Sequence, residues 1–147
     1  MKKVLGLFAL ALSVWLGQGQ VMAEDAKTAP IPDLVGTWTG PFKVMRAKGV
    51  GEGSLTLRVL EQDGPLLKLE KSWETPGVAG NVGGKEVDKA TEPLVGVVDF
   101  DGKSVHLAEQ DDNGLYTGRL TASDTLELIY VEAGHGTAYR VQLIRKK

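Results

Sequence analysis

From Leu34 to the end of the chain, apolar and polar residues alternate in short runs that Gly, Asp and Asn separate. An alternation with a period of two is typical of β-strands that bury one face, because successive side chains of a strand point to opposite faces. The pattern therefore predicts an all-β domain of about eight strands. The expected strands cover residues 34–46, 53–62, 66–74, 93–100, 103–110, 114–121, 125–132 and 137–145.

Turn dipeptides between the runs indicate how the strands connect. Asp63-Gly64, Asp101-Gly102 and Asn113-Gly114 are typical of tight hairpins, since glycine accepts the positive φ that such turns require. Hairpins between successive strands give an up-and-down order. Eight strands is also about the number that closes into a barrel whose interior is filled or holds one small ligand. We therefore expect a single-domain antiparallel up-and-down β-barrel.

The N-terminus has the composition of an export signal. Two lysines precede an apolar run over residues 4–16, and Ala23 ends a cleavage motif of small residues. The apolar run is shorter than the roughly 18–20 residues that span a bilayer. The sequence thus predicts a signal peptide over 1–23, a flexible charged segment over 24–33 and a barrel domain over 34–147. The expected location is periplasmic or secreted.

Composition excludes several classes of site. The chain has no cysteine, which rules out disulfides, thiolate metal sites and the lipid-bearing cysteine of a bacterial lipoprotein. Without Lys2 and Lys3 it carries 15 Lys and Arg against 19 Asp and Glu, a net charge of about −4 with the signs interspersed. We expect no nucleic-acid partner and no anionic-membrane surface. An outer-membrane barrel is disfavoured and no membrane span is expected in the mature chain, because polar strand faces carry charges such as Arg58 and Glu127.

The start of the first strand carries a family resemblance. Gly36-Thr37-Trp38 followed by an eight-stranded meander resembles the lipocalin, avidin and fatty-acid-binding group of calycin-type barrels. In lipocalins such a Gly-x-Trp closes the barrel floor under an arginine of the last strand, which implies that Arg140 or Arg145 stacks on Trp38. The chain lacks the second lipocalin motif and the C-terminal helix. It also resembles an uncharacterised exported bacterial domain with a Gly-Thr-Trp-x-Gly start, which brings no assigned activity.

Metal-binding patterns are sparse. His106 and His135 are the two histidines, and a metal site would need Glu109, Asp111 or Glu132 to meet them in the fold. The acidic run over residues 111–114 suits calcium only in part, because it lacks the distal bidentate Glu of a helical calcium loop. A hairpin turn explains that run fully. We therefore expect no metal site and no cofactor.

The longest break between strands covers residues 75–92. Its glycines favour either a lid over the barrel mouth or a disordered loop. Gly83-Gly84-Lys85 does not meet the spacing of a phosphate-binding loop, because Ala79 and Glu86 replace the glycine and hydroxyl residues required. The chain also lacks a Gly-x-Ser-x-Gly elbow. We expect no catalytic residues and no enzyme activity.

Inward aromatic residues are the candidate walls of a ligand cavity, because small-molecule pockets are largely apolar with a few polar groups. They are Trp38, Phe42, Trp73, Tyr130 and Tyr139. The corresponding function is the binding of a small, largely apolar ligand. A filled interior is favoured over an open pocket in so small a chain. The alternative function is therefore a protein-interaction or inhibitor module of the cell envelope with a solid interior and an unknown protein partner.

Overall fold

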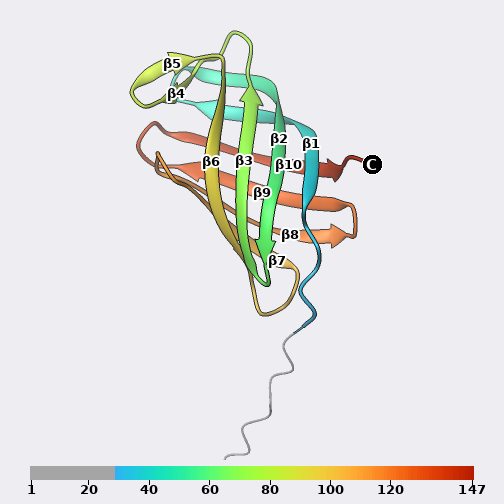
Figure 1. Cartoon of the computed structure of the whole chain (residues 1–147). Coiled ribbons are helices and arrows are strands. Elements are labelled where there is room, and N and C mark those ends of the chain that lie inside the picture. Colours follow the sequence, from blue (N-terminus) through green and yellow to red (C-terminus); the bar gives the residue numbers. More distant parts are fainter. Residues whose placement is uncertain (1–28) are drawn as a thin grey trace, which may run out of the picture.

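The computed structural model describes residues 29–147, which form a closed β-barrel with a small hairpin on one end (Figure 1). The predicted signal peptide over 1–23 lies outside the described residues, as do residues 24–28 of the segment that follows it. The strands are β1 (Gly36–Arg46), β2 (Gly49–Asp63), β3 (Leu66–Glu74), β4 (Gly80–Val82), β5 (Lys85–Val87), β6 (Lys89–Val98), β7 (Ser104–Glu109), β8 (Gly114–Ala122), β9 (Thr125–Glu132) and β10 (Thr137–Arg145).

Eight of these strands close the barrel in the order β1-β10-β9-β8-β7-β6-β3-β2. Every neighbouring pair is antiparallel, and β1 closes the barrel by pairing with β10. The predicted all-β, up-and-down barrel is confirmed. The described residues form no helix of the length and apolarity that a membrane crossing requires.

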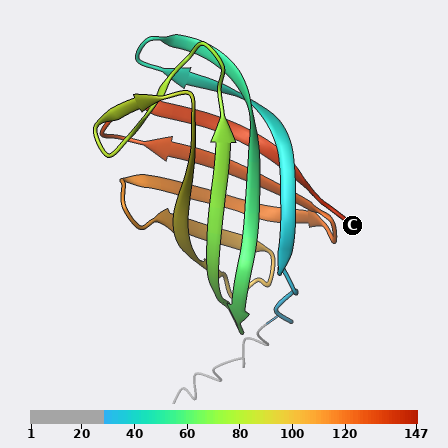
Figure 2. The same cartoon turned by 45° about the horizontal axis from the view of Figure 1, so that its top comes forward.

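The segment over residues 75–92 is more ordered than a plain loop. It contains the two-stranded sheet of β4 and β5, which lies over one end of the barrel (Figures 1 and 2). Its valines Val82 and Val87 pack against the barrel core. Of the two interpretations of this segment, the structure agrees with a lid.

The predicted strand boundaries agree best with the structure where one face of the strand is apolar and the other is polar. The predicted strands over 66–74, 125–132 and 137–145 match β3, β9 and β10. Strand β2 begins four residues before the predicted start at 53, and β6 begins at Lys89. Backbone pairing with β1 and β3 extends these two strands through positions that have no apolar alternation.

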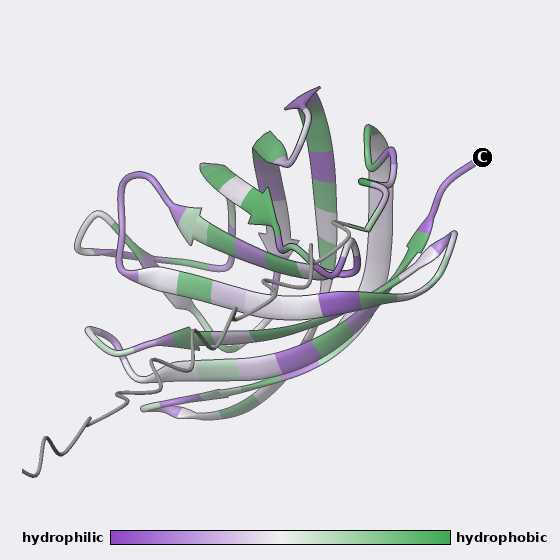
Figure 3. Cartoon of the chain, turned by 90° about the horizontal axis from the view of Figure 1, so that it is seen from below, coloured by the Kyte–Doolittle hydropathy of each residue, from purple (hydrophilic) through white to green (hydrophobic). Residues whose placement is uncertain are grey.

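Apolar side chains on the inward faces fill the barrel, and hydrophilic and hydrophobic residues alternate along the strands (Figure 3). Trp38 is 0% exposed and lies at the end where β1 begins. Its indole Nε1–H donates to the carbonyl of Leu34 at 3.0 Å. The guanidinium of Arg145 lies 5.3 Å from the centre of the Trp38 ring. Of the two arginines that the resemblance implied, Arg145 therefore takes the stacking position.

Residues 29–33 lie against this same end of the barrel, which we call the floor together with Leu34, Trp38 and Arg145. The amide of Ala29 donates to the carbonyl of Phe100 at 3.3 Å. The side-chain amide of Gln62 donates to the carbonyl of Pro32 at 2.8 Å, and its oxygen accepts from the amide of Leu34 at 2.9 Å. A backbone hydrogen bond and the Gln62 side chain thus hold the chain across the floor.

At one of the predicted turns, a positive φ is not the reason for the glycine. Gly64 and Gly102 have the expected positive φ, at 54° and 64°, but Gly114 does not. A Cβ on Gly114 would lie 2.3 Å from the carboxyl carbon of Glu109 and 2.4 Å from the hydroxyl of Tyr130. Close approach of these two side chains, rather than turn geometry, therefore requires a glycine here.

Candidate functional site

Charged and aromatic side chains converge at the end of the barrel opposite the floor, under the β4–β5 hairpin. We call this end the mouth. Its charged residues are Arg46, Lys71, Glu92, Glu109, Asp112 and Glu132, and its aromatic residues are Phe42, Trp73, Tyr130 and Tyr139. The cavity that they enclose has a volume of about 20 Å³, room for roughly one water molecule.

Strand periodicity explains why these charges face inward. Lys71 lies midway between the inward residues Leu69 and Trp73, and Glu109 follows Leu107 by two positions. Glu92 and Glu132 likewise continue the inward rows of β6 and β9. These inward rows are apolar over most of their length and turn polar at the mouth.

Lys71 binds two buried carboxylates. Its ammonium Nζ lies 3.0 Å from a carboxylate oxygen of Glu92 and also contacts Glu109. The side chains of Lys71, Glu92 and Glu109 are 4%, 9% and 2% exposed. Nζ also lies 5.0 Å from the ring centre of Tyr130 and 5.8 Å from that of Tyr116. The mouth therefore holds an ammonium group between carboxylates and aromatic faces.

Neutral donors hold both carboxylates in place. The indole Nε1–H of Trp73 donates to Glu92 at 2.7 Å, and the backbone amide of Gly114 donates to Glu109 at 3.1 Å. Ion pairs removed from water are stable only when their remaining lone pairs are also satisfied. The geometry meets that requirement around Lys71.

Stacked aromatic rings form the apolar wall of the mouth. The ring centres of Phe42 and Tyr139 are 4.4 Å apart, and those of Tyr130 and Tyr139 are 4.7 Å apart. The hydroxyls of Tyr116 and Tyr139 share a hydrogen bond of 2.6 Å. Burial raises the pKa of Tyr116 and of Tyr139, so both hydroxyls stay protonated at neutral pH.

Four of the five predicted ligand residues line the mouth. Phe42, Trp73, Tyr130 and Tyr139 line the mouth, whereas Trp38 lies at the floor. Tyr116, which is 1% exposed, is not among the predicted ligand residues. Tyr116 follows Gly114 by two positions, so the alternation along β8 identifies it as an inward residue.

Arg46 connects the mouth to the hairpin. Its guanidinium donates to the hydroxyl of Thr75 at 2.7 Å, contacts the carbonyl of Val78 and lies 5.0 Å from the centre of the Trp73 ring. Burial lowers the pKa of Arg46. A Cβ on Gly80 would lie 2.5 Å from the Trp73 ring, so the hairpin backbone lies directly on that indole.

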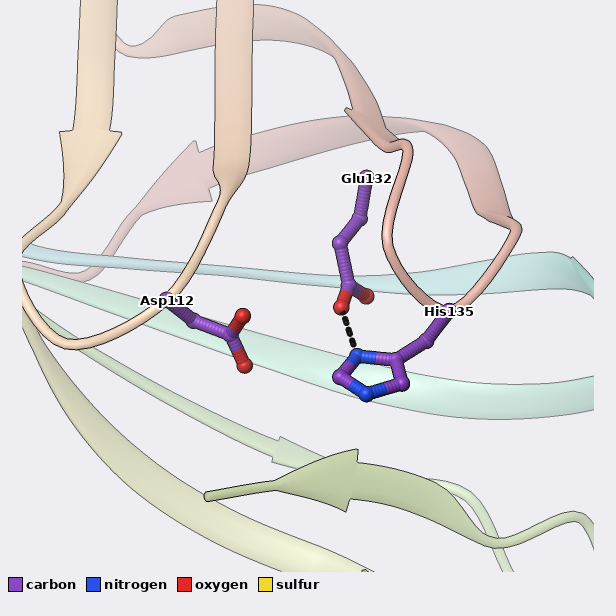
Figure 4. Close-up of side chains that lie close together, drawn as sticks. All are labelled: Asp112, Glu132 and His135. Atoms are coloured by element: carbon purple, nitrogen blue, oxygen red, sulfur yellow. Dashed lines mark hydrogen bonds and ion pairs between the residues drawn. The ribbon is translucent and has the colours of Figure 1, made fainter. Parts of the chain in front are cut away.

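A second cluster lies beside the first, where Asp112, Glu132 and His135 approach one another (Figure 4). His135 Nδ1 hydrogen-bonds a carboxylate oxygen of Glu132, and this bond raises the pKa of His135. The Glu132 side chain is 5% exposed, and it accepts from the hydroxyl of Tyr130 at 3.4 Å. Each of the three cluster residues offers a ligating atom within 4.8 Å of the other two.

A metal site is expected only if Glu109, Asp111 or Glu132 meets the histidines in the fold, and this cluster meets that condition in part. Glu132 does join His135, but the aspartate is Asp112 in place of Asp111. His106 lies apart, 3.5 Å from a carboxylate oxygen of Asp99. Glu109 belongs to the neighbouring group around Lys71. The i, i+3 spacing places His135 beside Glu132, and the fold brings Asp112 of the β7–β8 turn to both.

Comparisons with known proteins give a fold likeness and no more. No family model matches the chain, and no curated protein matches it. A de novo designed fluorescence-activating β-barrel is 14% identical, with a TM-score of 0.49 over 85% of this chain and 100% of its own. A redesigned β-barrel is 11% identical, with a TM-score of 0.46 over 78% of this chain and 92% of its own.

An S-type phycobiliprotein lyase from Guillardia theta is 15% identical, with a TM-score of 0.45 over 78% of this chain and 89% of its own. Likeness at this level does not extend to a ligand or an activity. Membership of the lipocalin and avidin group stays a prediction from the first-strand motif. The chain is an eight-stranded antiparallel β-barrel with a charged mouth.

Proposed function

We propose that this protein is an exported binding protein that holds a small cation at the barrel mouth and catalyses no reaction. The excess of carboxylates there carries the proposal. Glu92, Glu109, Asp112 and Glu132 face two permanent cations, Lys71 and Arg46. An uncompensated charge that is removed from water is costly, so a bound cation stabilises such a site.

The excess is concentrated on one side of the mouth. Lys71 neutralises Glu92 and Glu109 in part, since it lies between them. Within the described part of the chain, the buried carboxylate of Glu132 pairs with His135 and with no lysine or arginine. The cation therefore belongs beside Glu132 and Asp112, against the aromatic wall.

The proposed ligand differs from the largely apolar one that the aromatic residues suggest. Apolar side chains fill the barrel interior, and the cavity at the mouth is small and bounded by charges. A wholly apolar molecule would leave those carboxylates without water or a counter-ion. Aromatic faces such as those of Tyr130 and Tyr139 remain useful to a cation, because their ring quadrupoles attract positive charge.

Three cations and a neutral isostere of one of them test this proposal. Calorimetric titration with choline, Ca²⁺ and Zn²⁺ should show binding of at least one cation, and the neutral choline isostere 3,3-dimethylbutan-1-ol should not bind. Glu132→Gln should weaken the binding by at least about tenfold, which is the loss of about 1.4 kcal/mol. Glu127→Gln on the outer face is the matched control. Binding of the neutral probe alone, or of no probe, would overturn the proposal.

Protein interaction through the outer surface is the second candidate function, and an apolar row favours it. Seven residues lie directly opposite one another on neighbouring strands, in the order Val95, Ala108, Leu115, Val131, Ala138, Met45 and Val50. The valines, the leucine and the methionine of this row are 45% to 61% exposed. A contiguous exposed apolar patch is typical of an interaction surface.

Site-specific crosslinking tests this second function. A photo-crosslinking residue in place of Leu115 should capture a protein partner in cells that produce the chain. The same residue at Thr117, which lies one row away on the outer face of β8, should capture much less. Equal capture at both positions, or capture at neither, would contradict an interaction through this row.

A further inference from the structure

We infer that Asp112, Glu132 and His135 form a binding site for a divalent transition-metal ion of the Zn²⁺ class. The inference rests on the proposed cation-binding function and names its cation. Two segments supply the ligands: Asp112 lies in the β7–β8 turn, whereas Glu132 and His135 lie three residues apart at the end of β9 and in the turn after it (Figure 4). Fold closure at the mouth therefore assembles the site.

The spacing of the ligating atoms suits a metal of this size. They lie within 4.8 Å of one another. Zinc–ligand bonds of about 2.0–2.1 Å in tetrahedral geometry place the ligating atoms roughly 3.3 Å apart. Asp112 and His135 lie in turns and are partly or largely exposed, so modest side-chain rotations reach that spacing. The buried Glu132 is the fixed member of the set.

The donor types select the class of metal. One imidazole nitrogen with two carboxylates suits Zn²⁺ and its neighbours, whereas Ca²⁺ and Mg²⁺ take oxygen ligands throughout. His135 therefore favours a transition metal over the other cations that the mouth attracts.

The neighbouring cluster shows what an occupied cation position looks like in this barrel. Glu92, Glu109 and Asp112 also offer atoms within 4.8 Å of one another, but the ammonium of Lys71 already lies against both glutamates. Among residues 29–147 no lysine lies against Glu132, although Glu132 is buried as deeply as Glu92. Within the described residues the Glu132 carboxylate is hydrogen-bonded to His135 and to the Tyr130 hydroxyl, so a divalent ion bound there would balance its buried charge.

Three protein ligands leave one coordination position open. Open positions are typical of zinc sites that also bind water or a small anionic group. The small cavity of the mouth adjoins Asp112 and Glu132 and has room for one such water molecule.

Zinc titration of matched variants tests the site. After dialysis against a chelator, calorimetry with ZnCl₂ should give one site per chain in the wild type. His135→Ala and Asp112→Asn should each weaken zinc binding by at least about tenfold, the lower range for disturbing a metal site. His106→Ala and Asp111→Asn are the matched controls and should change the affinity less than about twofold. Circular dichroism verifies that each variant is folded.

Cobalt substitution adds a readout that a structural role would not affect. Co²⁺ in the wild type should give visible absorption bands of a nitrogen- and oxygen-ligated ion, and His135→Ala should remove or shift them. Unchanged zinc affinity and cobalt bands in His135→Ala would overturn the inference, as would an equal loss in His106→Ala.

The same panel separates failure of the metal site from failure of the proposed function. Choline or Ca²⁺ binding that Glu132→Gln abolishes and His135→Ala preserves, without zinc binding, would overturn the metal site and leave the cation-binding function standing. Absence of binding for Zn²⁺, Ca²⁺ and choline would overturn both.

Discussion

The two ends of this barrel are closed by different physical means. At the floor, Trp38 is fully buried, its indole donates to a backbone carbonyl, and Arg145 covers it from outside. At the mouth, the chain buries Lys71 with two glutamates and leaves Glu132 paired with a histidine. A buried apolar side chain needs no charged partner. A buried ion needs a partner of opposite charge and adds little net stability. The difference indicates that the floor serves the fold and the mouth serves binding.

Removal of the floor tryptophan should have the largest effect on folding. Trp38→Ala creates a cavity in the packed end of the barrel, and we expect the free energy of unfolding to fall by about 3–5 kcal/mol. Urea denaturation followed by circular dichroism measures it. A loss below about 1 kcal/mol would show that the floor is not the stable end.

Removal of the mouth lysine should lower the free energy of unfolding slightly less than removal of Trp38. Further substitutions at the mouth should restore that loss. Lys71→Met leaves Glu92 and Glu109 buried without their cation, so we expect a loss of about 3 kcal/mol. The triple variant Lys71→Met, Glu92→Gln, Glu109→Gln should return to within about 1 kcal/mol of the wild type, because no unpaired charge is left. A triple variant that is as unstable as Lys71→Met would contradict the ionic account of the mouth.

Displacement of the hairpin should open the mouth without unfolding the barrel. A side chain at Gly80 would collide with the Trp73 ring and the Arg46 guanidinium. We expect Gly80→Val to destabilise the protein by about 1–3 kcal/mol and to increase acrylamide quenching of Trp73 fluorescence. Trp73→Phe identifies the Trp73 component, and Lys85→Val on the same hairpin is the control. Unchanged quenching would show that the hairpin does not cover Trp73.

The smallest effect should come from a surface turn next to the floor. The hydroxyl and amide of Ser104 and the amide of Lys103 hydrogen-bond Asp101 and lower its pKa to about 2. The folded pKa lies below the unfolded one, so this stabilisation is present above about pH 4 and is lost as the pH falls through 2. Ser104→Ala should raise the pKa of Asp101 in an NMR titration, and an unchanged pKa would contradict the hydroxyl's role.

The sequence predicts the barrel far better than it predicts the site, and the reason is physical. Alternation with a period of two defines the inward rows, so the strands and four of the mouth aromatics follow from it. The same period also places Lys71 and Glu92 inside. Their burial depends on partners from neighbouring strands, which the alternation along one strand does not show.

No pattern in the sequence predicts which turns of the barrel lie against each other. Asp112 and His135 come from different turns, and the approach of Asp112 to Glu132 depends on the pairing of β8 with β9. Gly114 shows the same limit, because its neighbour Asn113 suggests a hairpin turn while the folded structure requires room for Glu109 and Tyr130. A contact between side chains of two such segments cannot be predicted from the alternation along one strand.

A zinc titration followed by ¹H–¹⁵N NMR tests the central claim most directly, because it reports on both ends of the barrel at once. The account predicts that ZnCl₂ shifts the amide signals of residues 109–114 and 132–137 and the Trp73 indole signal, while the Trp38 indole signal at the floor stays in place. Signals that shift around His106 and Asp99, or a spectrum that zinc leaves unchanged, would contradict the assignment of function to the mouth.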